Sequence, residues 1–153
     1  MGAAIVFAVE DFATVYPEAA PLMEQHWQEI AKNKDLLTLN PDHEKYLKLS
    51  SCLLLITARC STELVGYFLW ILLQHPHYKH VSVAEEDLHF LAPEYRRGIV
   101  GYSFVKAACA AAFARGAQVL VMREKIGHEH AALMKRLKFV PTDIVYTRSQ
   151  GIG

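Results

Sequence analysis

The spacing of apolar and polar residues predicts helices near the start of the chain and strands after them. Residues 3–9 are apolar, which favours a short buried strand. Apolar side chains then recur at helical spacing after Pro17, a residue that is tolerated in the first turn of a helix. We therefore expect a helix over residues 16–33. A second helix is expected at Asn40, which can cap it, with Pro41 in the first helical position.

The pattern changes to that of strands in the middle of the chain. Residues 52–57 and 64–73 are apolar and flank the polar turn 59–63. Two apolar runs joined by a short polar turn are typical of a β-hairpin. The sequence thus predicts two antiparallel strands here.

A third strand of this group is expected over residues 81–91, after a polar connection. Successive side chains of a strand alternate between its two faces. Glu85, Asp87 and His89 share one parity. We therefore expect these three polar side chains on one face of the strand.

The last third of the chain alternates between helices and strands. Residues 101–115 are rich in alanine and predict a strong helix that ends at Gly116. A short apolar strand over 118–122 is expected next, followed by a helix over 128–137 and a final strand over 139–148. This order predicts an α+β, or mixed α/β, fold with one central sheet.

Length and charge limit the classes of function. The chain has 153 residues, of which 52% are hydrophobic, so it can bury the core of a single domain spanning residues 1–153. It carries 16 basic and 16 acidic residues and no formal net charge. A dedicated nucleic-acid-binding protein usually has a basic excess. The balance argues against tight duplex binding, although a polynucleotide acceptor stays open.

The cysteines and the length of the apolar runs indicate where in the cell the protein is expected. Three cysteines without CxxC spacing favour a reducing compartment, so we expect a cytoplasmic protein. The longest apolar runs, such as residues 65–73, are too short to span a bilayer. His75, His77 and His80 have no cysteine or carboxylate close by and are interpreted as a polar hairpin loop, not a metal site.

The most informative chemistry lies where the strand ending at Leu91 leads through a loop into the alanine-rich helix. A helix N-terminus offers free backbone N–H groups and a partial positive charge. Glycine lets a phosphate approach such a backbone closely, and two arginines add full charges. Arg96, Arg97 and Gly98 therefore fit a diphosphate-binding loop. They also fit an ordinary strand-to-helix turn with solvated arginines.

The segment 91–101 resembles the acetyl-CoA signature of the GNAT (GCN5-related N-acetyltransferase) superfamily, Q/R-x-x-G-x-G/A after an apolar strand. Arg96 falls on the family's Gln/Arg and Gly101 on its last glycine. Ile99 takes the place of the middle glycine, and Gly98 comes one position early. Two further segments, 63–67 and 136–141, are also similar to family segments. The chain looks most like the small GNAT proteins of tailed phages.

The resemblance implies a single central, mostly antiparallel mixed sheet with helices on both faces. The strands ending near Leu91 and Met122 would splay apart, and acetyl-CoA would be the co-substrate, with no metal. Its pantetheine would lie along the edge of the first of these strands, and its diphosphate on the backbone N–H groups after it. The residues implied in coenzyme binding are Phe90, Leu91, Arg96, Arg97, Gly98, Ile99, Val100, Gly101 and Tyr102.

The family reaction is direct attack of an amine on the thioester, which calls for a base. Glu85, Asp87 and His89 are the candidates, and family spacing favours Glu85; each could equally be a surface residue of a half-exposed strand. The family's usual general acid is a tyrosine at a position that Met134 occupies here. Tyr146 is the expected substitute, unless water protonates the leaving thiolate.

The expected acceptor is a primary amine, either a small molecule or a protein lysine. Two alternatives stay open: an acyl-CoA-binding or interaction protein without catalysis, and a phage GNAT-like enzyme that modifies nucleic acid. A homodimer is a further expectation, as is location in the host cytoplasm if the protein is phage-encoded.

Overall fold

The computed structural model describes residues 4–150 and contains one five-stranded sheet with the order β1-β2-β3-β4-β5. Neighbours are antiparallel from β1 to β4, and β5 runs parallel to β4. Ala3, in the first expected strand, lies outside the described residues. The strands are β1 (Ile5–Glu10), β2 (Leu53–Cys60), β3 (Glu63–His75), β4 (Tyr78–Leu91) and β5 (Val119–Val121).

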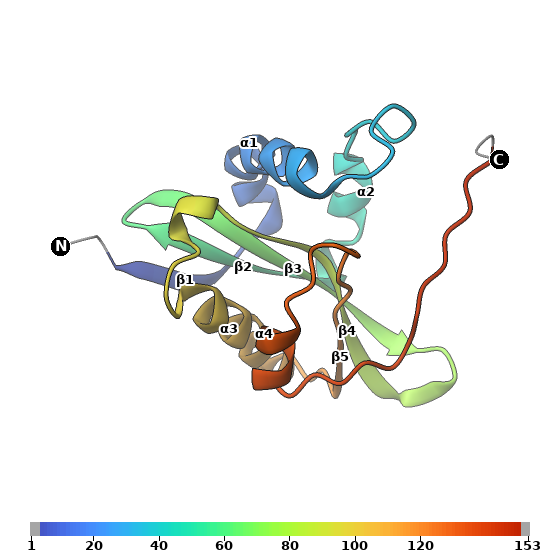
Figure 1. Cartoon of the computed structure of the whole chain (residues 1–153). Coiled ribbons are helices and arrows are strands. Elements are labelled where there is room, and N and C mark those ends of the chain that lie inside the picture. Colours follow the sequence, from blue (N-terminus) through green and yellow to red (C-terminus); the bar gives the residue numbers. More distant parts are fainter. Residues whose placement is uncertain (1–3, 151–153) are drawn as a thin grey trace.

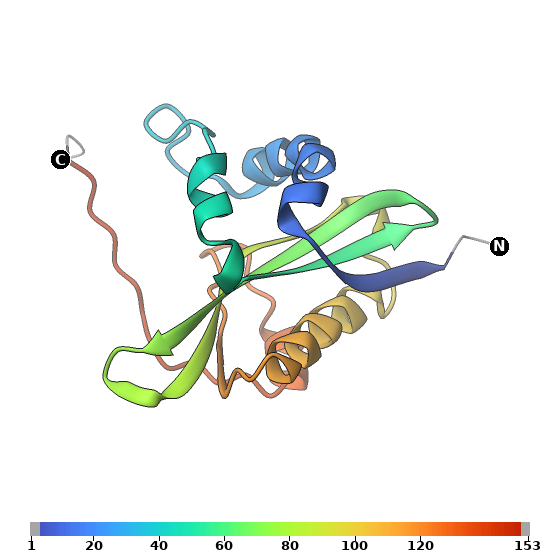
Figure 2. The ribbon, with the colours of Figure 1, turned by 180° about the vertical axis from the view of Figure 1, so that it is seen from behind.

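Helices cover both faces of this sheet (Figures 1 and 2). α1 (Phe12–Ile30) and α2 (His43–Lys48) lie over one face, and α3 (Val100–Ala114) and α4 (Ala131–Arg136) over the other. Two short 3-10 turns lie at Ser50–Cys52 and Pro93–Tyr95. The expected α+β architecture with a mostly antiparallel mixed sheet is thus confirmed. None of the helices in residues 4–150 has both the length and the apolar character needed to cross a membrane.

Each helical layer packs on its own apolar core. On the α3 face, Phe104 and Trp70 are fully buried, and the indole Nε1 of Trp70 donates to the Ala108 carbonyl at 2.9 Å. Fully buried alanines such as Ala112 let α3 approach the sheet closely. On the α1 face, Val15 and other apolar side chains of α1 pack against β2 and β3.

Helix α1 begins four residues earlier than expected. Asp11 caps it by accepting a hydrogen bond from the Thr14 backbone N–H at 2.9 Å, so Pro17 and Pro21 lie inside the helix. An interior proline removes one backbone hydrogen bond. Burial of Val15 and neighbouring side chains against the sheet offsets this loss. The cap and the core together outweigh the usual preference of proline for the first turn.

The expected last strand, residues 139–148, is wrong. Residues 137–150 form neither helix nor strand, and the side chain of Tyr146 is 87% exposed. Lys138 turns the chain with a φ of 65°, and Pro141 has no N–H for strand pairing. β5 is only three residues long and offers little backbone for a further strand. This segment runs along the outside of the molecule (Figure 1).

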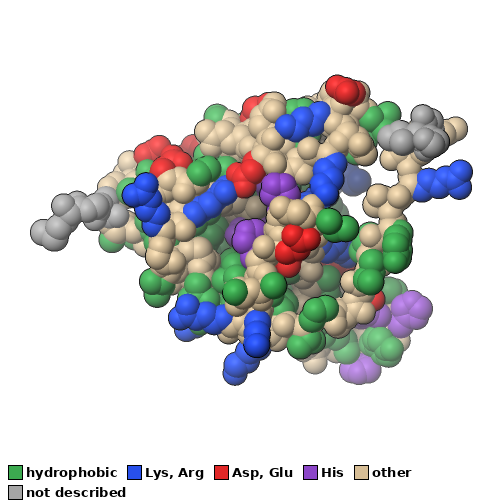
Figure 3. All heavy atoms as spheres, in the orientation of Figure 1, with side chains coloured by type: hydrophobic (Ala, Val, Ile, Leu, Met, Phe, Trp, Pro, Cys, Tyr) green, Lys and Arg blue, Asp and Glu red, His purple; other side chains and the backbone are tan. Residues whose placement is uncertain are grey.

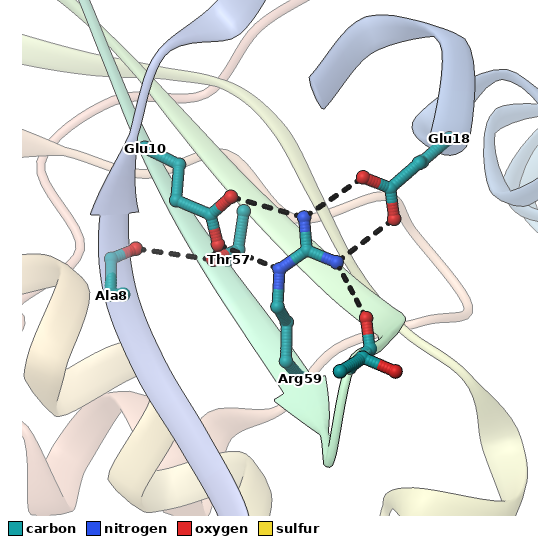
Figure 4. Close-up of polar contacts among 6 residues, drawn as sticks. Ala8, Glu10, Glu18, Thr57 and Arg59 are labelled. Atoms are coloured by element: carbon teal, nitrogen blue, oxygen red, sulfur yellow. Dashed lines mark hydrogen bonds and ion pairs between the residues drawn. The ribbon is translucent and has the colours of Figure 1, made fainter. Parts of the chain in front are cut away.

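A charged cluster ties β1, β2 and α1 together (Figure 4). The Arg59 guanidinium donates to Glu10 at 2.8 and 3.0 Å and to Glu18 at 2.9 and 3.0 Å. The hydroxyl of Thr57 also donates to Glu10. Hydrogen bonds from Arg59 hold the pKa values of Glu10 and Glu18 below their usual range. The cluster therefore fixes the start of α1 against the edge of the sheet.

Candidate active site

The sheet opens between β4 and β5. The two strands pair only over three residues on each side, Val83–Glu85 with Val119–Val121. From Glu86 to Leu91, β4 has no partner strand on this edge within residues 4–150. The expected splay is therefore confirmed. Such an edge presents backbone N–H and C=O groups to which an extended ligand can pair.

A β-bulge in β4 lies where the sheet opens. Leu88 pairs with Leu69 and Glu86 pairs with Trp70, so Asp87 is the extra residue. One extra residue exchanges the faces to which the following side chains point. Asp87 and Leu88 consequently lie on the α1 face.

His89 lies on the opposite face because of this bulge. The centroid of its ring is 4.7 Å from that of Phe68 and 6.0 Å from that of Phe104, both in the α3 core. Its Nδ1 lies 3.6 Å from a carboxylate oxygen of Glu86. The expectation that Glu85, Asp87 and His89 share one face is therefore wrong for His89.

A cavity of about 630 Å³ lies beside Asp87, between the sheet, α1, α2 and the connection between these helices. Its walls are mainly apolar, and Asp87 brings a carboxylate to its boundary. The cavity and the open edge of β4 meet at the bulge. The apolar side chains of its wall include Met23, Trp27, Ile30, Leu37, Leu39, Leu49, Ile71 and Leu88.

Two side-chain hydrogen bonds line this cavity. The Tyr46 hydroxyl donates to Oδ2 of Asp87 at 2.6 Å, and the Tyr67 hydroxyl lies 2.9 Å from Nδ1 of His26. Burial raises the pKa of both tyrosines, and the Asp87 carboxylate raises that of Tyr46 further. Burial lowers the pKa of His26 to about 4. At neutral pH both phenols are therefore protonated and His26 is uncharged, and the tautomer of His26 decides which of the two groups donates in the Tyr67–His26 hydrogen bond.

Sequence reasoning did not select His26, Tyr46 or Tyr67 as site residues. Each stands at an inward position of its helix or strand, where a buried aromatic residue is the ordinary interpretation. Both hydrogen-bonded pairs join residues 41 positions apart. In the sequence, these residues differ from ordinary core residues only in that each is an aromatic residue with a polar atom at an inward-facing position.

The loop after β4 leaves the space beside Gly98 open. Gly98 has a φ of +60°, and nothing lies within 4 Å of the position that a Cβ would take. α3 starts at Val100 without a side-chain cap. The N–H groups of Ile99, Gly101 and Tyr102 donate to no acceptor among residues 4–150. These free donors fit the diphosphate site that the sequence predicts.

The two arginines of the loop differ. Arg96 donates to the Leu91 carbonyl at 2.6 Å and makes a bidentate pair with Glu29 of α1, with both distances 2.7 Å. Its guanidinium also lies 5.3 Å from the centroid of Phe90. Arg97 is exposed and has no ion pair with a described residue. Arg96 therefore joins the loop to α1, and Arg97 is free to meet an anion.

The remaining candidates lie away from the cavity. Oε2 of Glu85 accepts from the Arg123 guanidinium at 3.0 Å, and Oε2 of Glu86 accepts from the Arg123 backbone N–H, also at 3.0 Å. Met134 is half-buried in α4. The exposed Tyr146 does not line the cavity. The structure thus brings Asp87, and not Tyr146, to the cavity.

Charges and potential metal ligands are dispersed over the described part of the chain. Basic and acidic side chains are interspersed on the face seen in Figure 3. In residues 4–150, no three His, Cys, Asp or Glu side chains gather in a group that could hold a metal ion. His75, His77 and His80 lie in the protruding β3–β4 hairpin.

No protein-family model matches the sequence, and a comparison with curated protein sequences finds no match either. Solved structures do match in fold. One is an aminoglycoside acetyltransferase, meta-AAC0020, from an uncultured soil metagenomic sample, with a TM-score of 0.71, 15% identity and coverage of 96% of this chain and 95% of the other.

A ribosomal-protein-alanine N-acetyltransferase from Brucella melitensis biovar Abortus 2308 is similar with a TM-score of 0.68 and 17% identity, over 96% of this chain and 99% of the other. A predicted acetyltransferase from Clostridium acetobutylicum, with acetyl-CoA, gives a TM-score of 0.70 and 12% identity, over 95% and 96%. The similarity extends over nearly the whole of each chain. The chain therefore has the fold of the GNAT acetyltransferases.

Proposed function

We propose that the protein is an acetyl-CoA-dependent N-acetyltransferase that acts on a primary amine. The observation that carries this proposal is the meeting of three features on β4: an open strand edge, a loop with free N–H donors, and a cavity with a carboxylate at Asp87. The edge and the loop suit a long phosphorylated thioester. The cavity suits its acceptor.

In this proposal the coenzyme lies along the unpaired edge of β4. The backbone at Phe90 and Leu91 pairs with the pantetheine amides, and the free N–H groups of Ile99, Gly101 and Tyr102 bind the diphosphate. Arg97 adds a full positive charge. Similarity to an acetyltransferase structure with acetyl-CoA supports this arrangement.

The proposed chemistry is a direct transfer. An alkyl amine has a pKa of about 10.4, so removing its proton at pH 7 costs about 5 kcal/mol. The Asp87 carboxylate is placed to receive that proton, and Tyr46 orients it. The amine nitrogen then forms a bond to the acetyl carbon while the carbon–sulfur bond breaks. The nitrogen loses its second proton as the amide forms, and the leaving thiolate takes up that proton through water.

Asp87 is preferred over the other candidates because it lines the cavity. Glu85 is paired with Arg123, and His89 packs in the α3 core. Roles for Glu85, His89 and Tyr146 remain predictions from sequence. So do a single domain over the chain, a homodimer, a cytoplasmic location and a phage origin.

Two measurements test this proposal in order. Acetyl-CoA at 100 times its dissociation constant should stabilise the protein by about 2.7 kcal/mol, visible as a rise in Tm. Release of free thiol should then depend on both acetyl-CoA and an added amine. A protein that shows neither response is not an acetyltransferase.

Met134 and Ile99 favour one second candidate, a coenzyme-binding protein without catalysis. The family tyrosine is absent at Met134, and the Ile99 side chain limits how closely a phosphate can approach the loop. Under this alternative acetyl-CoA raises Tm, but no amine releases thiol.

A further inference from the structure

The charged side chains around the acceptor cavity differ in whether they already make hydrogen bonds within the protein. Two carboxylates line it, Asp42 and Asp87, together with three lysines, Lys32, Lys45 and Lys125. His26 adds no charge at neutral pH, because burial holds its pKa near 4. The lining therefore carries one more positive than negative charge.

Hydrogen bonds show which of these groups can meet a ligand. Oδ1 of Asp42 caps α2 by accepting from the Lys45 backbone N–H at 2.9 Å. The Lys32 ammonium donates to the Ile126 carbonyl at 2.6 Å. The ammonium groups of Lys45 and Lys125 make no hydrogen bond or ion pair with residues 4–150. Two lysines of the lining thus have ammonium groups without a partner among residues 4–150, and Asp87 is the lining carboxylate that caps no helix.

We propose that the acceptor is a monoamine with an apolar body and an anionic group, such as an amino acid or a related amino carboxylate. Asp87 receives its ammonium group, the apolar wall receives its body, and Lys45 and Lys125 receive its anion. This inference rests on the proposed N-acetyltransferase function and goes beyond it by naming the class of acceptor.

The same charges disfavour polycationic acceptors. A polyamine or an aminoglycoside carries several ammonium groups, and only Asp87 offers a carboxylate that is not already capping a helix. Its further ammonium groups would meet lysines, and like charges at close range repel. One structural neighbour is an aminoglycoside acetyltransferase in complex with sisomicin. The cavity of the present chain therefore selects a different kind of amine on the same fold.

The test uses matched amines in the thiol-release assay with acetyl-CoA. Phenylalanine is compared with 2-phenylethylamine, and 4-(aminomethyl)benzoate with benzylamine, so that each pair differs in the carboxylate and the two acids differ in its distance from nitrogen. Spermidine and kanamycin represent polycations. We expect at least one acid to exceed its neutral counterpart about tenfold in kcat/KM, and to exceed both polycations.

Variants assign this preference to the lysines. Lys45→Gln and Lys125→Gln should each reduce the ratio of acid to neutral counterpart about fivefold, because a partly exposed charge pair contributes up to about that factor. Lys48→Gln is the matched control, since Lys48 is an exposed lysine in α2 that does not line the cavity. It should leave the ratio unchanged.

The outcomes separate this inference from the proposed function. If neutral amines or polycations are the better acceptors, or if neither lysine variant changes the ratio, the inference is wrong and the acetyltransferase proposal stands. If no amine of any class releases thiol, both are wrong.

Discussion

Asp87 is the extra residue of the bulge where the sheet opens, and it also lies at the boundary of the cavity. Asp87→Asn keeps the size of the side chain but removes most of its basicity. We expect kcat/KM for the amine to fall about 100-fold, as for loss of a general base. The rise in Tm with acetyl-CoA should persist.

Glu85→Gln is the control for this prediction. Its carboxylate pairs with Arg123 and does not line the cavity. Its effect on kcat/KM should stay within a few-fold. A larger loss for Glu85→Gln than for Asp87→Asn would indicate that Glu85, which family spacing favours, is the general base.

His26 should make the protein sensitive to mild acid. Its pKa falls from 6.5 to about 4 on folding, mainly through burial, so the unfolded chain binds the extra proton between these values. Stability is therefore fully present above pH 6.5 and declines by up to about 3 kcal/mol as the pH falls towards 4. His26→Phe should flatten this decline, measured as Tm against pH.

Glu10 and Glu18 affect stability in a lower pH range than His26, so the two effects can be told apart. Both have lowered pKa values, so their contribution is present above their unfolded pKa of 4.5 and is lost below it. A profile for His26→Phe that matches that of the unchanged protein between pH 6.5 and 4.5 would contradict the role given to His26.

Single residues were predictable where one local rule governs them. Gly116 ends α3 with a φ of 93°, as its place after an alanine-rich helix indicates. His89 was not predictable, because strand parity holds only without a bulge, and no residue type in the sequence announces one at Asp87.

At the scale of elements, β3 packs closely on β4 beside the site. A Cβ added at Gly66 would lie 2.7 Å from the Phe90 carbonyl oxygen. Gly66→Ala must therefore push β4 aside and should destabilise the protein by about 2 kcal/mol. We expect a lower urea midpoint and weaker binding of acetyl-CoA, since Phe90 and Leu91 form the proposed coenzyme edge.

Gly101→Ala is the matched control for Gly66→Ala. Nothing lies within 4 Å of a Cβ added at Gly101, which stands in the first turn of α3 with ordinary backbone angles. The Gly101→Ala protein should be as stable as the unchanged protein or slightly more stable. Equal stability of the two variants would show that β4 yields without strain.

The cluster around Arg59 gives a second prediction at this scale. Arg59→Leu leaves Glu10 and Glu18 facing each other without a cation. We expect a loss of about 2 kcal/mol, less than for a fully buried pair because Glu18 is half-exposed. Chemical denaturation measures it, and Arg115→Leu, at an exposed arginine without an ion pair among residues 4–150, should change stability much less.

Elements were predictable where an apolar pattern and its end signals agree. The strands β2, β3 and β4, and helix α3, lie within a few residues of expectation because period and flanking turns coincide there. α1 starts early because Asp11 is a stronger start signal than Pro17. Residues 139–148 have strand-like composition, but β5 is too short to pair with them.

At the scale of the whole molecule, the C-terminal segment is separable from the core. The side chains of Ile144, Val145 and Tyr146 are 78%, 65% and 87% exposed. A chain that stops at Pro141 should therefore keep its Tm within about 2 °C and still bind acetyl-CoA. If this shortened chain still releases thiol, Tyr146 is not required for catalysis.

A chain that stops at Arg136 is the contrasting truncation. It also loses Leu137 and Phe139, which pack against the α3 core. Its Tm should fall by several degrees. Equal loss in both truncations would mean that residues 142–150 hold the fold in a way that their exposure does not show.

The order of the elements from β1 to α4 was predictable because local patterns and a family resemblance agree in it. The motif after Leu91 placed the loop and the splay. The residues that line the cavity beside Asp87 were not predictable, because they come from α1, α2 and β4, whose side chains come together only in three dimensions. The choice of acceptor therefore had to wait for the structure.

The bulge at Asp87 also bears on how this strand can change. Its inserted position separates the side chains on the cavity face, Asp87 and Leu88, from those that secure the α3 layer. Substitutions at 87 and 88 thus change the wall of the cavity while 86 and 89 keep the scaffold intact. Deleting Asp87 would leave Glu86 opposite Trp70 and Leu88 opposite Leu69 in one regular ladder, so the strand would keep its two faces and lose only the carboxylate at the cavity.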